Sequence, residues 1–355
     1  MINLPKFKIK NLEFNVIQGG MGVGISSRKL AGAVANCGGI GIVAGVELGS
    51  LKNYSGKKYI EANRKALQEE IRAARQISPK GILGVNIMYA LTDYEGLIKV
   101  AAEEDINLII SGAGLARNLP DLVKNPQINL IPIVSSIKAA RVMINSWEKY
   151  NKIPDALVVE GPAAGGHLGF KFNDLINKTT PKLENIAKEI KNNYPNISII
   201  VAGGIYTGQD IKYYGDQGFG VQMATRFVTT QECDADDRFK QAYINAEKKD
   251  IVIIKSPVGM PGRAIKNPFL EKVINKEKIN FNCKYNCLKT CNPKESPYCI
   301  AEALIKAQQG NFKEGFVFAG SNAYRATKEN SLDENGKFIT VKTLMERLSK
   351  EYHST

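Results

Sequence analysis

Apolar residues along this chain fall into short continuous runs, separated by longer stretches that mix apolar and charged positions. The runs are rich in valine and isoleucine and lack polar alternation, which is typical of parallel strands buried on both faces. Glycine borders most of them, as expected at strand ends. We therefore expect strands at residues 16–20, 39–43, 82–86, 107–111, 130–134, 156–159, 197–202 and 220–223.

The intervening stretches combine apolar periodicity with charge and predict helices. We expect these at residues 27–36, 62–76, 94–103, 115–124, 138–150, 183–193, 208–215 and 234–248. Strands and helices that alternate eightfold over about 250 residues predict an α/β fold, a (β/α)8 TIM barrel. A doubly wound open sheet is the alternative, but the glycines of residues 19–24 lack the spacing of a dinucleotide-binding loop.

The pattern changes after residue 254. Residues 255–263 are rich in proline and glycine and predict a loop, and a segment rich in lysine and cysteine follows as far as Cys299. We expect residues 1–265 to form the barrel. Residues 266–355 would form a cysteine-containing extension packed on it, because this part is short and poor in apolar residues for a core of its own.

Composition limits the functional classes. The 355 residues are 44% hydrophobic, and no apolar run approaches the ~20 residues of a membrane helix, nor does the start carry the apolar stretch of a secretion signal. We expect a cytoplasmic protein. The net charge is +13, but the lysines are scattered rather than grouped in a basic block with aromatic residues, which disfavours nucleic acid as the partner. A phosphate-bearing cofactor or an acidic carrier suits this charge, as does solubility alone.

Four expected strand ends share a glycine-rich composition, at residues 18–22, 160–169, 201–205 and 220–225. Glycine lets the backbone approach a ligand closely, and barrels usually hold a phosphate with the loops after strands seven and eight. Close packing of strand against helix is the alternative explanation for any single glycine pair. Because the carboxyl ends of the strands share one face of a barrel, we expect all four loops to gather around a phosphorylated cofactor.

Two side chains near these loops are candidates for chemistry. His167 follows Gly165 and Gly166, and an imidazole beside backbone N–H groups can exchange a proton next to a bound anion. Asn86 ends another expected strand, and its amide can both donate to and accept from the edge of a planar ring. A surface histidine and a structural amide are the corresponding alternatives.

These segments resemble the nitronate monooxygenase (2-nitropropane dioxygenase-like) flavoproteins and the related flavin-dependent enoyl-acyl carrier protein reductase II. The resemblance covers about the first 265 residues in the family's order. It is carried by residues 17–21, 31–41, 84–86, 160–169, 202–205 and 220–227.

The resemblance implies FMN at the carboxyl-end mouth of the barrel, with His167 beside the flavin and no separate nicotinamide domain. Family members often carry Gln in place of Glu160 and Gly in place of Ala224, so this chain adds a carboxyl group near the flavin. We assign no metal ligand. The residues that the resemblance assigns to the cofactor are Gly20, Met21, Gly22, Asn86, Glu160, Gly165, Gly166, Gly203, Gly204, Gln222, Met223, Ala224 and Thr225.

Two activities follow from the resemblance. The favoured one is nitronate monooxygenase: His167 would take the α-proton of a nitroalkane or orient a nitronate, and oxygen would complete conversion to a carbonyl compound and nitrite. The alternative is an NAD(P)H-dependent enoyl-acyl carrier protein reductase, with the same histidine beside nicotinamide and enoyl thioester. A non-catalytic flavin- or phosphate-binding protein is a third hypothesis from a different class. The partner is thus a small molecule, and the sequence leaves a homodimer open.

Cysteines are concentrated near the C-terminus. Cys283, Cys287, Cys291 and Cys299 lie within 17 residues, and on a helix the spacing of four would place the first three on one face. Three alternatives stay open: reduced, partly buried thiols, a metal or iron–sulfur site, and a redox-active disulfide. The spacing matches neither a common zinc motif nor the usual ferredoxin run.

Overall fold

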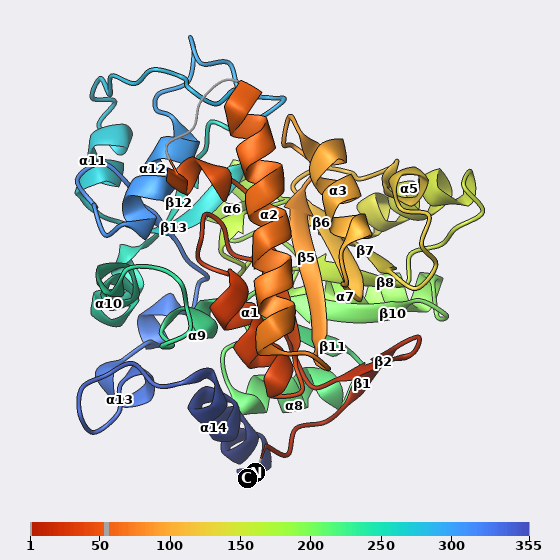
Figure 1. Cartoon of the computed structure of the whole chain (residues 1–355). Helices are drawn as coiled ribbons and strands as arrows, with labels where there is room; N and C mark the ends of the chain where they lie inside the picture. The colour runs from red at the N-terminus through yellow and green to blue at the C-terminus, as the bar shows by residue number, and fades with distance from the viewer. Residues whose placement is uncertain (1, 53–56, 355) are drawn as a thin grey trace.

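The predicted TIM barrel is confirmed by the computed structural model, which describes residues 2–52 and 57–354 (Figure 1). Eight parallel strands close on themselves, with β11 pairing β3 to complete the ring. In chain order they are β3 (Ile17–Gln18), β4 (Ile40–Ala44), β5 (Ile82–Met88), β6 (Leu108–Gly112), β7 (Asn129–Val134), β8 (Ala156–Glu160), β10 (Ser198–Ala202) and β11 (Gly220–Met223).

Helices surround this barrel, and two of the expected ones differ most from the sequence prediction. The helix expected at residues 115–124 is a single turn, and the one expected at 234–248 starts only after Asp236, whose carboxylate accepts the N–H of Arg238 as an N-cap. The helices within the barrel are α1 (Arg28–Asn36), η1 (Gly49–Lys52), α2 (Lys57–Ile77), α3 (Tyr94–Glu103), α4 (Leu119–Leu122), α5 (Ile137–Glu148), α6 (Phe172–Ile176), α7 (Leu183–Asn193), α8 (Gly208–Gly215), α9 (Thr225–Val228), α10 (Asp237–Asn245) and η2 (Lys248–Asp250).

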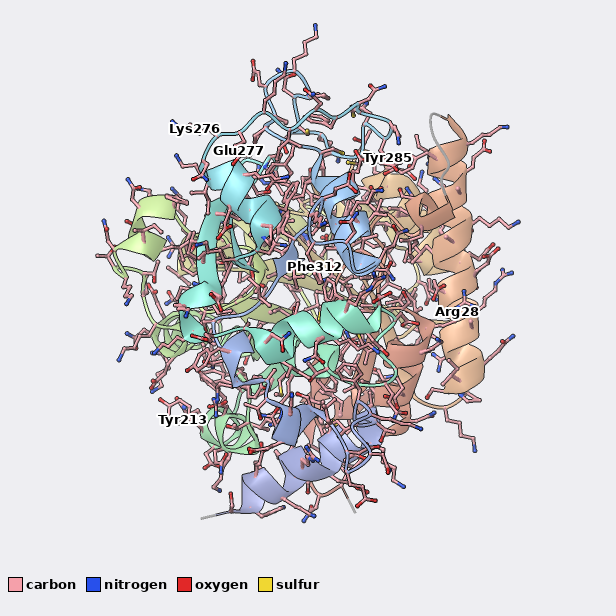
Figure 2. All side chains as sticks on the ribbon, turned by 90° about the vertical axis from the view of Figure 1, so that its left-hand side faces the viewer. Arg28, Tyr213, Lys276, Glu277, Tyr285 and Phe312 are labelled. Carbon is pink, nitrogen blue, oxygen red and sulfur yellow. The ribbon has the colours of Figure 1, made fainter. Side chains whose placement is uncertain are left out.

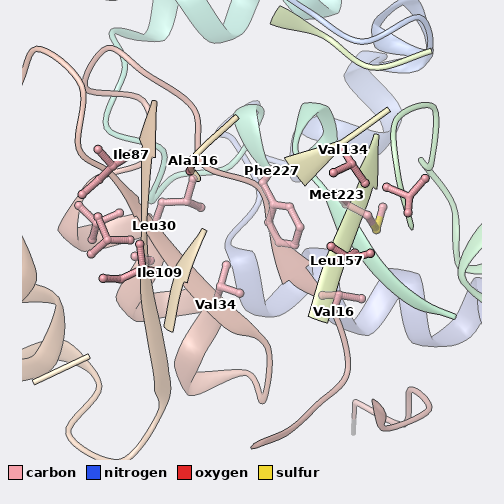
Figure 3. Packing of buried hydrophobic residues seen from close by; sticks show 14 of the residues in the cluster. Val16, Leu30, Val34, Ile87, Ile109, Ala116, Val134, Leu157, Met223 and Phe227 are labelled. Carbon is pink, nitrogen blue, oxygen red and sulfur yellow. The ribbon is translucent and has the colours of Figure 1, made fainter. Parts of the chain in front are cut away.

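The strands are buried on both faces, as their unbroken apolar sequences require. Ile40 and Ile42 of β4 point into the barrel, where they pack with Val158 of β8. Outward-facing residues such as Ile109 and Leu157 pack with the helices, and Figure 3 shows them with Leu30 of α1 in this outer layer. Gly41 allows α1 to lie directly on β4, because a Cβ there would come within 1.8 Å of the Ala31 carbonyl oxygen.

An N-terminal hairpin that the sequence analysis missed closes the amino end of the barrel. It consists of the antiparallel strands β1 (Phe7–Ile9) and β2 (Leu12–Phe14). Phe14 is 1% exposed and packs in the same cluster as the inward-facing strand residues. The amino end is therefore filled with apolar side chains, and the open space of the barrel lies at the carboxyl ends of the strands.

The loop predicted at residues 255–263 was wrong. This region is a β-hairpin of β12 (Ile251–Lys255) and β13 (Pro261–Ile265), with only residues 256–260 as the turn. Along its other edge, β13 pairs with the two-residue strand β9 (Gly166–His167) and with β14 (Val317–Phe318). This second sheet places His167 next to segments that are distant in the sequence.

The chain after β13 contributes four helices, one 3-10 turn and β14. No helix forms over Cys283–Cys291 in the described residues, so the spacing of four does not place these thiols on one helical face; Asn286 there has a φ of 46°, which a helix excludes. No described helix is long and apolar enough to cross a membrane. The helical elements of this part are α11 (Pro268–Ile274), α12 (Ile300–Gln308), η3 (Ala323–Arg325), α13 (Lys328–Ser331) and α14 (Val341–His353).

Candidate functional site

One cavity of about 270 Å³ lies at the carboxyl ends of the barrel strands. Its wall includes all four glycine-rich loops, so the structure brings together the segments that the sequence analysis expected at one mouth. The predicted residues that line it are Gly20, Met21, Gly22, Asn86, Glu160, Gly165, Gly166, His167, Gly203, Gly204, Gln222, Met223, Ala224 and Thr225.

Glycines shape the floor of this cavity. A Cβ at Gly20 would lie 2.5 Å from the Cβ of Asn86, and one at Gly22 would lie 1.9 Å from Val46. Gly203 and Gly204 have φ angles of +100° and +84°, a conformation that favours glycine, and their N–H groups donate to no described residue. Adjacent N–H groups without partners form a concavity suited to an anion.

Polar side chains without partners point to a bound group that supplies them. The amide of Asn86 and the carboxyl of Glu160 make no hydrogen bond within the described part of the chain. The Oε1 atom of Gln222 is buried and likewise unpaired there. A buried polar atom left unpaired costs about 1–3 kcal/mol, so the Gln222 oxygen favours a ligand with hydrogen-bonding atoms, and the half-buried Asn86 and Glu160 side chains line the same cavity.

The cavity suppresses the charges of its titratable groups. Burial raises the pKa of the Glu160 carboxyl to about 8 and lowers the pKa of the His167 imidazole to about 4. In both cases the cause is desolvation, which disfavours the charged form. Near neutral pH, His167 is therefore uncharged and Glu160 is largely protonated.

The second sheet fixes the position of His167. Its backbone pairs with Gly262 of β13, and its Nε2 atom lies 2.8 Å from the hydroxyl oxygen of Ser256, in the turn of the hairpin. The ring of Phe318 packs edge-on against the imidazole, with centroids 5.0 Å apart. Among described residues the other ring nitrogen has no hydrogen-bond partner, and His167 lines the cavity.

The loop between β8 and β9 is held from outside the barrel. The half-buried Arg263 side chain of β13 donates from Nη1 to the carbonyl oxygens of Pro162 and Ala164, at 2.7 and 2.5 Å. Gly165 lies so close to the chain at Ala319–Gly320 that a Cβ would come within 2.5 Å of that backbone. The glycine loop is thus ordered by contacts rather than being a flexible turn.

Sequence reasoning missed the part of the wall that comes from elsewhere in the chain. Gly320, whose N–H donates to the Thr225 hydroxyl at 3.2 Å, follows a short apolar run and resembles the predicted strand-end loops in composition, which was the available signal. The other wall residues carry no such signal. They include Val46, Glu47, Leu91, Val258, Cys287, Leu288, Ile300, Leu304 and Phe318.

Comparison with known proteins places this architecture in one family. The family model described as "Nitronate monooxygenase" matches residues 3–340. The chain is 27% identical over 295 residues to a probable nitronate monooxygenase of Staphylococcus aureus, covering 74% of this chain and 78% of that protein. It is 26% identical over 275 residues to a Mycobacterium tuberculosis octahydro-indene-carboxyl-CoA dehydrogenase, covering 77% and 68%.

Solved structures give the same architecture over nearly the full length. FabK from Thermotoga maritima has a TM-score of 0.73 at 25% identity, with 97% of this chain and 94% of that chain covered. A nitroalkane oxidase from Streptomyces ansochromogenes has a TM-score of 0.73 at 18% identity, covering 96% and 95%, which is a likeness of fold. Because the family model spans almost the whole chain, the protein belongs to the nitronate monooxygenase family of oxidoreductases.

Proposed function

We propose that the protein is an FMN-dependent oxidoreductase that reduces the carbon–carbon double bond of an enoyl thioester with NAD(P)H. The observation that carries this choice is the charge of the cavity. No lysine or arginine is among the described residues that line it, and its carboxyl and imidazole groups favour their neutral forms. The anionic reacting group of a nitronate would find no lysine or arginine on this wall, whereas the neutral reacting group of a conjugated thioester needs none; the flavin phosphate would be held by backbone N–H groups instead.

The residues of the cavity fit the flavin mononucleotide that the proposal requires. The unpaired N–H groups of Gly203 and Gly204 suit its phosphate, and the unpaired amides of Asn86 and Gln222 suit the edge of its ring. The backbone at Gly20 and Gly22 leaves room for close approach. When bound, the flavin supplies two-electron redox chemistry, which no amino-acid side chain provides.

His167 would act as an uncharged hydrogen-bonding group toward the substrate. Ser256 engages one ring nitrogen and orients the ring, which leaves the other for the thioester carbonyl oxygen. Polarising that carbonyl favours hydride delivery to the β-carbon and protonation of the α-carbon. The overall reaction consumes one NAD(P)H and one proton and yields the saturated thioester.

Two similar proteins support thioester chemistry. FabK, an enoyl-acyl carrier protein reductase, is similar over nearly the whole chain, and the M. tuberculosis relative is by its name a dehydrogenase of a carboxyl-CoA compound. Nitronate oxidation is the second candidate, because the S. aureus relative is a probable nitronate monooxygenase.

Steady-state assays of the FMN-loaded protein separate the candidates. We expect oxidation of NADH or NADPH to accelerate when a crotonyl thioester is added without oxygen, with the saturated thioester detected by mass spectrometry. Oxygen uptake driven by propyl nitronate without nicotinamide would support the second candidate and refute the first. If neither substrate changes the redox state of the bound flavin, only the hypothesis of a non-catalytic binding protein remains.

Replacement of His167 tests its role. We expect His167→Asn to lower kcat for the enoyl thioester about 100-fold while FMN affinity stays within twofold, because the imidazole contacts substrate rather than phosphate. Since burial lowers the imidazole pKa to about 4, wild-type kcat/KM should show no histidine ionisation between pH 6 and 8. His353→Asn, which changes the exposed second histidine, is the matched control. Equal activity of the two variants would remove His167 from the mechanism.

A further inference from the structure

The residues that follow β14 return to the glycine-rich loops of the cavity. Phe312, near the centre of the face shown in Figure 2, lies in the loop between α12 and β14. After β14 the chain continues to the 3-10 turn η3. We call residues 320–325 the C-terminal turn. Its first residue, Gly320, lines the cavity, so the turn lies directly behind the cavity wall.

The C-terminal turn donates hydrogen bonds to three of the four glycine-rich loops. These loops follow β8, β10 and β11, so the turn is fixed against three neighbouring strand ends. The three bonds run from the Gly320 N–H to the Thr225 hydroxyl at 3.2 Å, from the Ser321 N–H to the Ala163 carbonyl oxygen at 3.0 Å, and from the Asn322 amide to the Gly204 carbonyl oxygen at 2.5 Å.

Two hydroxyl groups of this region are free to donate. The Ser321 hydroxyl has no hydrogen-bond partner within the described residues, and its oxygen lies 3.9 Å from the position that a Cβ on Gly204 would occupy. It is therefore next to the unpaired N–H groups of Gly203 and Gly204. The Thr225 oxygen accepts the Gly320 N–H, which leaves its own proton for another acceptor. Both hydroxyls thus suit the anion for which the N–H groups are arranged.

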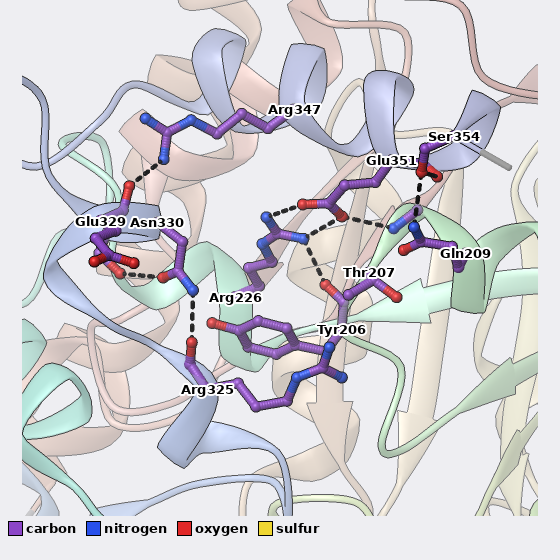
Figure 4. A network of polar contacts seen from close by, with 12 residues as sticks. Tyr206, Thr207, Gln209, Arg226, Arg325, Glu329, Asn330, Arg347, Glu351 and Ser354 are labelled. Carbon is purple, nitrogen blue, oxygen red and sulfur yellow. Dashed lines mark hydrogen bonds and ion pairs between the residues drawn. The ribbon is translucent and has the colours of Figure 1, made fainter.

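A positive charge lies beside the same loops. The guanidinium of Arg325 lies over the ring of Tyr206, two residues after Gly204, at 5.0 Å from the ring centroid. Arg226 contacts this ring at 5.1 Å, as Figure 4 shows, but it is paired with Glu351. Arg325 forms no ion pair among the described residues. Its contact with the ring holds the cation in place while its charge stays locally uncancelled.

We propose that the C-terminal turn completes the phosphate site of FMN, with Ser321 donating a hydrogen bond to the phosphate and Arg325 balancing its charge from behind the wall. This inference rests on the FMN assignment proposed above. A phosphate monoester carries a charge of about −1.5 to −2 near neutral pH, and no lysine or arginine is among the described residues that line the cavity. Arg325 is half-buried, so salt screens its attraction less than that of an exposed side chain.

A comparison of FMN with riboflavin, which lacks the phosphate, tests this role without turnover. Flavin-free full-length protein is titrated with each flavin, and binding is followed by flavin fluorescence. We expect Ser321→Ala and Arg325→Gln each to weaken FMN binding about tenfold and to leave riboflavin binding within about twofold of wild type. Arg325→Lys retains the charge and should retain most of the FMN affinity. Arg141→Gln, which removes an exposed arginine of α5, is the matched control and should change neither affinity.

The outcomes separate this inference from the proposals on which it rests. Equal losses for both flavins would mean that the turn only supports the fold and would overturn the phosphate role, as would unchanged FMN affinity in both variants. Wild-type protein that binds neither flavin would instead refute the FMN assignment itself. None of these results depends on whether the protein reduces enoyl thioesters.

A second measurement needs only FMN and covers the case in which riboflavin binds too weakly to titrate. Added salt should weaken FMN binding by wild type more than by Arg325→Gln, because screening acts on the attraction between guanidinium and phosphate. Parallel salt dependences of the two proteins would remove Arg325 from the phosphate site.

Discussion

At the residue scale, Glu160 and His167 are kept uncharged by the same surroundings. Desolvation raises the carboxyl pKa to about 8 and lowers the imidazole pKa to about 4. The carboxyl pKa therefore lies above the imidazole pKa, which is the reverse of their order in water. Near neutrality the carboxyl group can therefore donate a hydrogen bond and the imidazole can accept one. A glutamine at position 160 would supply a donor but no titration.

Replacing Glu160 should change how stability depends on pH. The folded-state pKa lies above the ordinary value of 4.5, so the carboxyl group favours folding most below pH 4.5, and this advantage is lost as pH rises through 8. We expect Glu160→Gln to gain about 2 to 4 kcal/mol in unfolding free energy relative to wild type between pH 5 and pH 8.5 in flavin-free protein. Denaturant titrations at both pH values measure it, with exposed Glu295→Gln as control. Parallel pH dependences would contradict a buried carboxyl group.

The sequence identified the residues of the cavity floor because their types repeat at strand ends. Glycine pairs, Asn86 and His167 follow apolar runs, and the topology of a barrel gathers such positions. The wall residues Val258 and Leu288 were beyond reach, because an isolated apolar residue in a loop looks the same whether it covers a cavity or packs elsewhere.

At the element scale, the wrongly predicted loop at residues 255–263 is explained by long-range strand pairing. Residues 255–263 contain proline and glycine in the pattern of a loop, yet β13 forms because β9, β12 and β14 satisfy its backbone from both sides. The cysteine spacing fits a helix, but Asn286 and Pro293 oppose one. The barrel strands were easier to predict, since their continuous apolar runs carry the signal locally.

The close approach of the Gly165 loop to the backbone at Ala319–Gly320 can be tested by adding a methyl group at Gly165. A methyl group at Gly165 would lie 2.5 Å from that backbone, so Gly165→Ala must push the two segments apart. We expect a loss of about 1–3 kcal/mol in stability and at least tenfold weaker FMN binding, measured by fluorescence titration. Gly215→Ala in α8, whose Cβ would meet nothing nearer than 3.4 Å, is the control. Unchanged FMN binding would show that this crossing does not shape the cofactor site.

At the scale of the whole molecule, the C-terminal helix is held on the barrel by an ion pair whose arginine is buried and whose glutamate is partly exposed. Arg226, which follows β11, donates two hydrogen bonds of 2.6 and 2.7 Å to the carboxylate of Glu351 in α14 (Figure 4). Arg226 is 4% exposed and also donates to the Tyr206 carbonyl oxygen, while Glu351 accepts the N–H of Gly208. Nearby, Asn3 bonds to Ser349, so both chain termini meet at this end.

Breaking this pair should be costly because it leaves a buried guanidinium without a counter-charge. We expect Glu351→Ala to lower the free energy of unfolding by about 3–5 kcal/mol, whereas Lys350→Ala at an exposed position of the same helix should change it by less than about 0.5 kcal/mol. Chemical denaturation with far-ultraviolet circular dichroism measures both. Similar small losses in the two variants would mean that water reaches Arg226.

Two parts of the chain build the cavity, and the sheet of β9, β12, β13 and β14 belongs to the second of them. The strand ends of the barrel form the floor of the cavity. The β12–β13 hairpin and the residues that follow it cover the cavity and hold His167 in position. Mutation or insertion in the part of the chain that covers the cavity can therefore change which substrate is admitted while the strand-end loops beneath stay intact. Related enzymes with this architecture would diversify by changing the segments that cover the cavity while they keep the strand-end loops that form its floor.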